Sequence, residues 1–388
     1  MLIVAVLVVR GVPHAPHRRL RERRSLKLDG AVPEHTDRVR IRSNPGKRVV
    51  GLDIQPGYVA AVEGHPGQAA VHRAATAVLA PEVVRDGEVI DADTLAVVLR
   101  EMFAQHKLGP RVRLGVANHR IVMRTLDLPP LSGAKEIASA VRFQAQDQIP
   151  MPLDEAVIEH HTLGTVETSE GRRTRVVLVA ARRDMVDKLV GAIRKAGLRP
   201  QGIDLSAFAM IRALYTPGNE VPTLYVSVGG VTNLAVAVGR TCVFTRVAAH
   251  GTEGIAGELG DRRGLTLEHA RAWLKHVGLT APTEETEGDS NIVEAARDVL
   301  EVGIARIADE LRTSLDFHAT QDAGAKVEKA ILTGPAIEIP GFCEQLAAQA
   351  GIPLEAGVLR EGHPGALGDL QRGLLAVATG LSVEEVAA

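Results

Sequence analysis

Short apolar runs separated by turn residues follow one another from residue 49 and return in the same order from residue 223. The first copy has three predicted strands and a turn: Val49–Ile54, Gln55-Pro56-Gly57, Tyr58–Val62 and Val71–Val78. The second copy repeats the succession: Thr223–Val228, Gly229-Gly230-Val231, Thr232–Val238, Gly239-Arg240 and Thr241–Val247. Helical stretches follow both copies. The duplication predicts an α/β protein whose two similar lobes face each other across a ligand-binding cleft.

A different unit lies between the two copies. Its predicted strands and helices are Ile121–Leu128, Gly133–Gln148, Ala156–Leu163, Thr174–Ala181, Arg183–Ala196 and Pro200–Leu205. The predicted helix Ser206–Leu214 returns the chain to the lobes. This order of elements indicates a small α+β insertion that forms a separate subdomain.

The part of the chain after the second copy is mainly helical. Apolar residues at three- and four-residue spacing predict helices, and one apolar run predicts a strand. The expected elements are helices at Leu265–Val277, Ile292–Ala319, Ile339–Ala350 and Asp369–Leu381, and a strand at Val327–Leu332. The acidic segment Glu284–Ser290 is expected to be a surface loop.

Composition and charge narrow the function classes. A net charge of −2 gives no general attraction to nucleic acid. The cysteines, Cys242 and Cys343, both have apolar neighbours, so we expect no disulfide framework and no zinc site, and a cytoplasmic protein.

The first 47 residues differ from the rest. Met1–Val9 is apolar, and the stretch up to Arg48 holds twelve Lys and Arg against four acidic residues. Residues 1–47 are read either as a basic, disordered leader or upstream extension, or as a segment that touches an anionic membrane surface.

Several characteristic motifs follow one another along the chain: Gly51-Leu52-Asp53-Ile54 with Val62-Glu63, Val84-Arg85-Asp86-Gly87, Arg124–Pro129, Gln144–Pro152, Leu178–Arg182, Ala196-Gly197-Leu198, Val243–Arg246, Ser314–Phe317 and Ile339–Phe342. In this order and spacing they resemble the PilM family of type IV pilus assembly proteins. The resemblance covers nearly all of the chain from Val49 to Leu381.

The resemblance implies an actin-like fold, a duplicated ribonuclease H-like fold shared with the cell-division protein FtsA. The expected division is a first lobe (1A; 48–120, 206–220 and 366–388), an insertion (1C; 121–205) and a second lobe (2A/2B; 221–365). Resembling proteins bind ATP with Mg²⁺ in the cleft and hold the cytoplasmic tail of the membrane protein PilN. The chain is thus expected at the inner face of the cell membrane, attached through its partners and contacting other pilus assembly components.

The nucleotide site of the family can be carried over residue by residue. The matching positions are Asp53, Gly57, Gly229, Gly230, Thr232, Asn233, Glu258 and Gly334, with Asp53 also the candidate Mg²⁺ ligand. This sequence departs from the family at five positions beside them. Gln55 stands in place of glycine, Pro56 near the place of a small hydroxyl residue, Ala60 in place of lysine, Ser227 in place of aspartate, and Pro335 in place of a further glycine. These departures predict a degenerate ATP site with weak or absent hydrolysis.

The partner groove implied by the resemblance lies between the first lobe and the insertion. The candidate residues there are Ile137, Val141, Gln144 and Ile149, for which plain core packing is the competing interpretation. Two alternatives to a scaffold stay open: an active actin-like ATPase and an FtsA-like division protein. Leu381–Ala388 is too short for an amphipathic membrane helix of the FtsA type.

Overall fold

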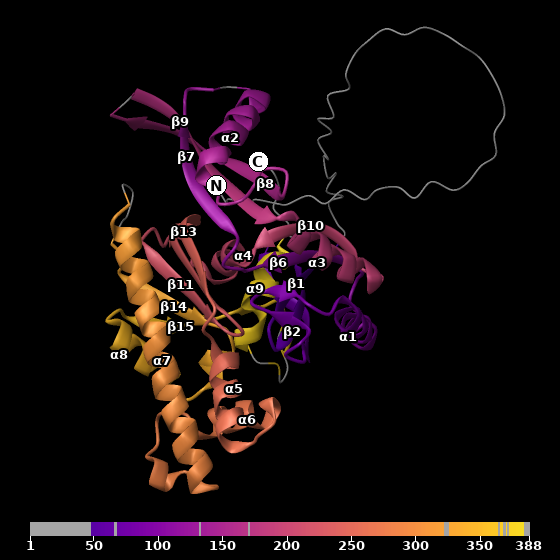
Figure 1. Cartoon of the computed structure of the whole chain (residues 1–388), viewed down its shortest axis with the longest axis vertical. Helices are drawn as coiled ribbons and strands as arrows, with labels where there is room; N and C mark the ends of the chain where they lie inside the picture. Colours follow the sequence, from indigo (N-terminus) through magenta and orange to yellow (C-terminus); the bar gives the residue numbers. More distant parts are fainter. Residues whose placement is uncertain are drawn as a thin grey trace, which may run out of the picture.

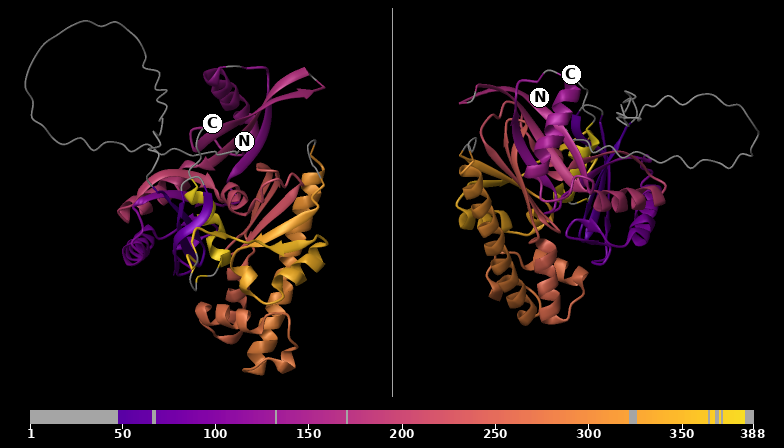
Figure 2. Two further views of the ribbon diagram at one scale, coloured as in Figure 1. Left: turned by 180° about the vertical axis from the view of Figure 1, so that it is seen from behind. Right: turned by 45° about the horizontal axis from the view of Figure 1, so that its top comes forward.

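The computed structural model describes residues 48–65, 68–131, 133–169, 171–321, 326–363, 365–367, 370 and 372–383. The predicted leader, residues 1–47, lies outside the described residues, as do residues 384–388. No helix within these ranges is long and apolar enough to cross a membrane. Two lobes lie side by side, the insertion stands at one end, and α6 (Leu267–Val277) lies at the other (Figures 1 and 2).

The first lobe is built on a six-stranded sheet of order β10-β6-β1-β2-β3-β16. Its strands are β1 (Val50–Gln55), β2 (Tyr58–His65), β3 (Gln68–Val78), β6 (Arg111–Val116), β10 (Arg199–Leu205) and β16 (Arg360–Glu361). β1, β2 and β3 form an antiparallel meander, whereas β6 runs parallel to β1 and β10 parallel to β6.

The second lobe repeats this arrangement in a five-stranded sheet of order β13-β12-β11-β14-β15. Its strands are β11 (Thr223–Val228), β12 (Thr232–Val238), β13 (Thr241–Ala248), β14 (Lys329–Thr333) and β15 (Leu354–Ala356). β11, β12 and β13 are antiparallel, and β14 and β15 continue the sheet in parallel. Order and direction match those of the first lobe, so the duplication predicted from the two sets of apolar runs is confirmed.

The insertion has a three-stranded antiparallel sheet of order β7-β9-β8 with one helix packed on it. Its elements are β7 (Val122–Leu128), α2 (Ala134–Gln148), β8 (Ala156–Thr168) and β9 (Gly171–Arg182). Alternate residues of β9 face opposite sides: Val176 and Leu178 join the core beneath α2, and Val177 and Val179 join the core of the first lobe. The insertion therefore has its own core and also packs on the first lobe.

The predicted boundary of the insertion at residue 205 is wrong. Helix α3 (Arg183–Lys195) packs on α1 (Ala92–Gln105) and contributes Val186 and Ile193 to the first-lobe core. β10 pairs with β6 in the first sheet. We therefore propose an insertion of residues 121–182, with residues 183–205 belonging to the first lobe.

The remaining elements cover the sheets. They are β4 (Val84–Arg85), β5 (Glu88–Val89), α5 (Thr252–Arg263), η1 (Thr283–Glu285), α7 (Ser290–Ala319), η2 (Pro335–Glu338) and α8 (Phe342–Ala350). Helix α7 begins at an N-cap, Asp289, whose side chain accepts a hydrogen bond from the backbone N–H of Asn291. A buried stripe along α7, including Leu300 and Ile304, packs into the core of the second lobe.

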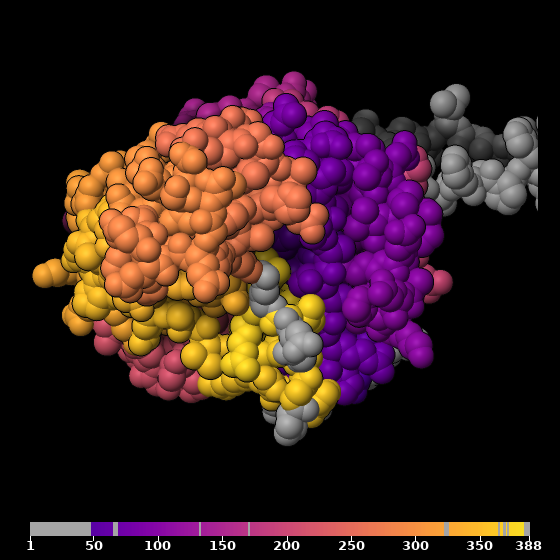
Figure 3. All heavy atoms as spheres, turned by 90° about the horizontal axis from the view of Figure 1, so that it is seen from below, coloured from indigo at the N-terminus to yellow at the C-terminus, as the bar shows by residue number. Residues whose placement is uncertain are grey.

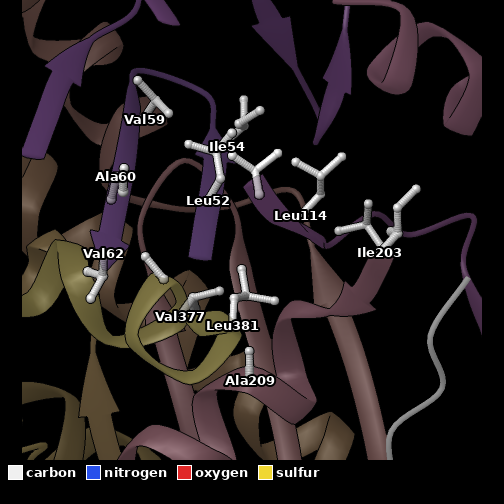
Figure 4. Close-up of a cluster of buried hydrophobic side chains, with 14 of the residues drawn as sticks. Leu52, Ile54, Val59, Ala60, Val62, Leu114, Ile203, Ala209, Val377 and Leu381 are labelled. Atoms are coloured by element: carbon white, nitrogen blue, oxygen red, sulfur yellow. The ribbon is translucent and has the colours of Figure 1, made fainter. Parts of the chain in front are cut away.

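Helices α4 (Ser206–Leu214) and α9 (Arg372–Ser382) lie between the two sheets and pack against each other. They cross where a Cβ built on Gly380 would lie 1.8 Å from the carbonyl oxygen of Ala209, an approach that only glycine permits. Figure 4 shows Val377 and Leu381 of α9 among the apolar side chains of the first sheet. A fully buried ion pair joins Arg212 of α4 to Asp204 of β10.

Candidate functional site

The tips of the duplicated hairpins touch at the centre of the interlobe cleft. The β1–β2 turn carries Pro56, and the β11–β12 turn carries Gly230. A Cβ built on Gly230 would lie 2.5 Å from the carbonyl oxygen of Pro56 and 2.6 Å from its Cδ atom. The space between these two turns, which were predicted to hold the nucleotide, is therefore filled by the protein itself.

Asp53 and Gln55 lie on the same side of β1 because they are two residues apart on a strand. The side-chain amide of Gln55 donates a hydrogen bond of 2.9 Å to the Asp53 carboxylate, which is 1% exposed. Burial raises the pKa of Asp53 from 3.8 to about 6, although the hydrogen bond from Gln55 lowers it. Gln55 thus occupies the position beside Asp53 that a hydrated cation would need.

The polar groups of the second hairpin are engaged within the second lobe. The N–H of Gly229 donates to the carbonyl of Val231 at 3.1 Å, and the carbonyl of Gly229 accepts from the Thr252 hydroxyl at 3.1 Å. The hydroxyl of Thr232 donates to the carbonyl of His250. Gly229 and Thr232 were predicted to face a nucleotide, but the groups named here hold the turn against the start of α5.

Gly334 directly follows β14 and contacts the start of α9. Its φ is +89°, and a Cβ there would lie 2.4 Å from the carbonyl oxygen of Val228. The N–H of Gly334 donates to the carbonyl of Gly373 at 3.1 Å. The loop at Gly334, predicted as part of the nucleotide site, therefore closes on α9 instead of leaving its backbone open.

A cavity of about 450 Å³ remains beside the hairpin tips, lined largely by apolar side chains. It lies along the seam in Figure 3, where the first lobe (indigo) meets the second-lobe helices (orange). Glu253 of α5 and Arg271 of α6 form an ion pair in its wall, with Arg271 Nε 2.9 Å from Glu253 Oε1. Gly57 (φ +89°) lies against this pair, since a Cβ there would be 2.4 Å from Glu253 Oε2.

Tyr58 extends from the first hairpin to the second. A Cβ on Gly229 would lie 3.2 Å from the Tyr58 hydroxyl oxygen. Burial, with the carboxylates of Asp53 and Glu253 nearby, raises the pKa of Tyr58 well above its usual value. The neutral hydroxyl of Tyr58 therefore adds to the protein atoms that occupy the centre of the cleft.

Two residues predicted for the nucleotide site point elsewhere. Glu258 forms ion pairs with Arg262 on its own helix and with Arg306 of α7, so it faces away from the cleft. Asn233 is 3% exposed and lines a second cavity, of about 290 Å³. This junction cavity lies where the first lobe, the insertion and the second lobe meet; Val116 comes from the first lobe and Met123 from the insertion.

The predicted partner residues on α2 are mostly core residues. Ile137, Val141 and Ile149 are at most 9% exposed and pack in the core of the insertion, as the competing interpretation holds. Gln144 is half-buried. On the same helix, Phe143 is 72% exposed. Ile137, Val141 and Ile149 therefore stabilise the insertion and offer little surface to a partner.

The residues of the cleft do not fit a magnesium triphosphate. Gln55 engages the one predicted metal ligand, Asp53, and Pro56 fills the phosphate position against Gly230. Within the described ranges, no three His, Cys, Asp or Glu side chains gather as a metal-binding group. The departures noted in the sequence thus have a direct counterpart in the contacts of the cleft.

Comparison with known proteins identifies the family. The sequence matches the family model of the type IV pilus assembly protein PilM over residues 51–358. The chain belongs to this family. A solved structure described as the PilM–PilN type IV pilus biogenesis complex matches with a TM-score of 0.72 and 24% identity, over 87% of this chain and 98% of that chain. The PilM family match does not favour the FtsA-like alternative.

Two further structures place the fold among actin-like proteins. The ethanolamine utilization protein EutJ from Carboxydothermus hydrogenoformans has a TM-score of 0.50 and 14% identity, over 87% of this chain and 90% of that chain. MreB5 of Spiroplasma citri bound to AMPPNP has a TM-score of 0.52 and 12% identity, over 86% and 95%. The predicted actin-like α/β fold is therefore confirmed.

Three residues that shape the cleft of this PilM family member were not predicted from the sequence. Glu253, Arg271 and Tyr58 line the larger cavity. Glu253 follows Gly251-Thr252 at the start of α5. It could have been recognised as an acidic residue in the first turn of the helix that comes after the second hairpin. Arg271 gave no comparable signal, because its pairing depends on how α5 and α6 pack.

Proposed function

We propose that this chain is a scaffold of a type IV pilus assembly machine and binds the cytoplasmic tail of a PilN-like inner-membrane protein. The match to the PilM family over residues 51–358 carries this proposal, and the likeness in fold to the PilM–PilN complex supports it. Binding of the tail would hold the chain at the inner face of the membrane through its partner, in contact with other pilus assembly components.

We also propose that the cleft binds ATP weakly and does not hydrolyse it at a useful rate. AMPPNP is bound in the MreB5 structure, so the fold is compatible with nucleotides. In this chain the Gln55–Asp53 contact and the Pro56–Gly230 contact would both have to break first. In addition, Ala60 and Ser227 replace a lysine and an aspartate of the family, and each lost charge-assisted contact is worth about 1.5–3 kcal/mol, so the two losses weaken affinity by a factor on the order of 10² to 10⁴.

A peptide-binding experiment tests the scaffold. A labelled peptide with the sequence of the PilN-like tail from the same organism is titrated with the purified chain and followed by fluorescence anisotropy. We expect saturable binding in the micromolar range, and none for a scrambled peptide of equal charge. Equal binding of both peptides, or none by either at high micromolar concentration, would overturn the proposal.

Calorimetry with Mg-ATP tests the cleft separately. We expect no saturable heat up to about millimolar ATP, which corresponds to a binding free energy weaker than about −4 kcal/mol. A double variant, Gln55→Gly with Pro56→Ser, restores the residue types usual in the family and should bind ATP more tightly than the parent. Micromolar binding and steady turnover by the parent chain would refute the degenerate cleft.

A further inference from the structure

The junction cavity combines apolar walls with a buried amide. The β6–β7 connection, the start of α4 and the β12–β13 hairpin line it together. Its apolar residues are Val116, Ala117, Ile121, Met123, Leu205, Ala207 and Val247. Asn233 contributes a polar side chain from the second lobe, facing residues of the first lobe and the insertion. A ligand in this cavity would therefore touch all three parts of the molecule.

Asn233 has an acceptor that the protein leaves without a partner. Its side chain is 3% exposed, and its Oδ1 atom is buried with no hydrogen-bond partner. Its position on the strand explains the direction of the side chain: the preceding Thr232 turns to the opposite face, where its hydroxyl donates to His250. A buried polar group without a partner is unfavourable, so the side chain is better explained by a ligand than by packing.

Other polar side chains of the cavity are already engaged. The amide of Asn118 donates to the carbonyl of Asp86 and accepts from the N–H of Arg120. The hydroxyl of Thr245 donates to the carbonyl of Leu234 at 2.9 Å. Because these groups are committed and His119 is exposed, Asn233 is the buried polar group of the cavity best placed to select a ligand.

The charge of the cavity also limits the ligand. Arg246 and the exposed His119 are the basic side chains in the lining, and Arg246 forms an ion pair of 3.2 Å with Glu310 of α7. A phosphate or a carboxylate ligand would have to compete with Glu310 for the guanidinium of Arg246. A neutral polar group flanked by apolar ones fits it better.

The geometry points to an extended peptide as the occupant, with the Asn233 amide pairing with one peptide bond of its main chain. A carboxamide offers one acceptor and two donors, which complement the N–H and C=O of a peptide bond. The apolar walls then accept the neighbouring side chains, as in other sites that read an extended chain. This inference rests on the proposed function, with the PilN-like tail as the peptide, and adds that the second lobe contributes to its recognition.

The decisive experiment combines a variant with chemically altered peptides. Tail peptides that carry a single N-methyl group at successive backbone nitrogens are titrated with the parent chain and with Asn233→Ala. We expect Asn233→Ala to weaken binding of the unmodified peptide at least tenfold. One N-methyl position should weaken binding to the parent by a similar factor and have no further effect on Asn233→Ala. Parent-like binding by Asn233→Ala, or additive effects at every position, would overturn the inference.

Matched controls separate this inference from a loss of fold and from failure of the scaffold proposal. Asn291→Ala, at an exposed position on α7, should bind the tail like the parent. Asn233→Leu should melt at the same temperature as the parent or higher, since it replaces an amide that lacks a partner, but it should no longer bind the tail peptide. A melting temperature well below that of the parent would assign Asn233 a structural role and overturn the inference. If the parent does not bind the unmodified tail, the scaffold proposal itself fails, whereas tight binding by both parent and Asn233→Ala removes only the role of Asn233.

Discussion

Replacement of Asp53 by asparagine should make the protein more stable at neutral pH. Asp53 is 1% exposed and has a pKa of about 6, against 3.8 for an ordinary aspartate. This difference corresponds to about 3 kcal/mol, because one pKa unit is worth ~1.4 kcal/mol. Asparagine keeps the oxygen that accepts from Gln55 but loses the charge and adds a buried NH2 group, which together cost about 2 kcal/mol. We therefore expect a net gain of about 1 kcal/mol at pH 7.5.

The sign follows from proton linkage. A carboxyl group whose pKa is higher in the folded state binds its proton more tightly there, so folding is favoured when the group is protonated. The cost of the charged Asp53 is absent below about pH 4, grows between pH 4 and 6, and is fully present above pH 6. The advantage of Asp53→Asn should consequently disappear as the pH falls from 7.5 to 4.

Urea unfolding, followed by far-ultraviolet circular dichroism, measures the free energy of unfolding of the parent and of Asp53→Asn at pH 7.5 and at pH 4. Asp298→Asn, at an exposed position on α7, is the matched control and should change the free energy of unfolding by less than about 0.5 kcal/mol throughout. If Asp53→Asn shows the same difference from the parent at pH 4 and pH 7.5, or destabilises the protein at pH 7.5, the reasoning about the buried charge is refuted.

Two further substitutions test the packing of α4 and α9, the helices that lie between the two sheets, both measured by urea unfolding at pH 7.5. Arg212→Ala leaves the buried carboxylate of Asp204 without its partner and should cost about 3–5 kcal/mol; a loss under 1 kcal/mol would mean that water reaches this pair. Gly380→Ala places a methyl group 1.8 Å from a carbonyl oxygen of α4 and should cost several kcal/mol, on the order of an overpacked core. Gly191→Ala, on α3 with no atom within 4 Å of the new methyl group, should instead add about 0.5–1 kcal/mol, and equal losses in the two glycine variants would contradict the close helix crossing.

The duplicated hairpins could be predicted because their signal is local. Apolar runs with turn residues between them fix the strands and their antiparallel pairing, and Gly57 and Gly230 stand at turns where the structure has them. The parallel neighbours β6 and β10 are separated from β1 along the chain, so no local pattern shows which sheet receives them. This is why the boundary of the insertion was placed too far along the chain.

The candidate site was harder to predict, since it depends on which way each side chain faces, and residue spacing alone does not determine that. Glu253 and Glu258 lie on one helix, but five residues correspond to about 140° of rotation, so only one of them faces the cleft. Asn233 sits one residue from Thr232 on a strand, and the register decides that Asn233 faces the junction cavity and Thr232 the opposite side. For Ile137 and Val141, apolar helical spacing is equally compatible with a core and a groove, and the packing of α2 on its sheet decides for the core.

The central position of α9 has a consequence for the order of folding. The first sheet needs α9 to complete its buried layer. The distance along the chain is large: Arg113 of β6 donates to the carbonyl of Leu381, 268 residues further on. Contacts of such long sequence separation form late and slow folding. Until α9 packs, the apolar inner faces of β1 and β2 stay exposed, so an incompletely folded chain is prone to aggregate, and shortening the chain within α9 would leave the core of the first lobe incomplete.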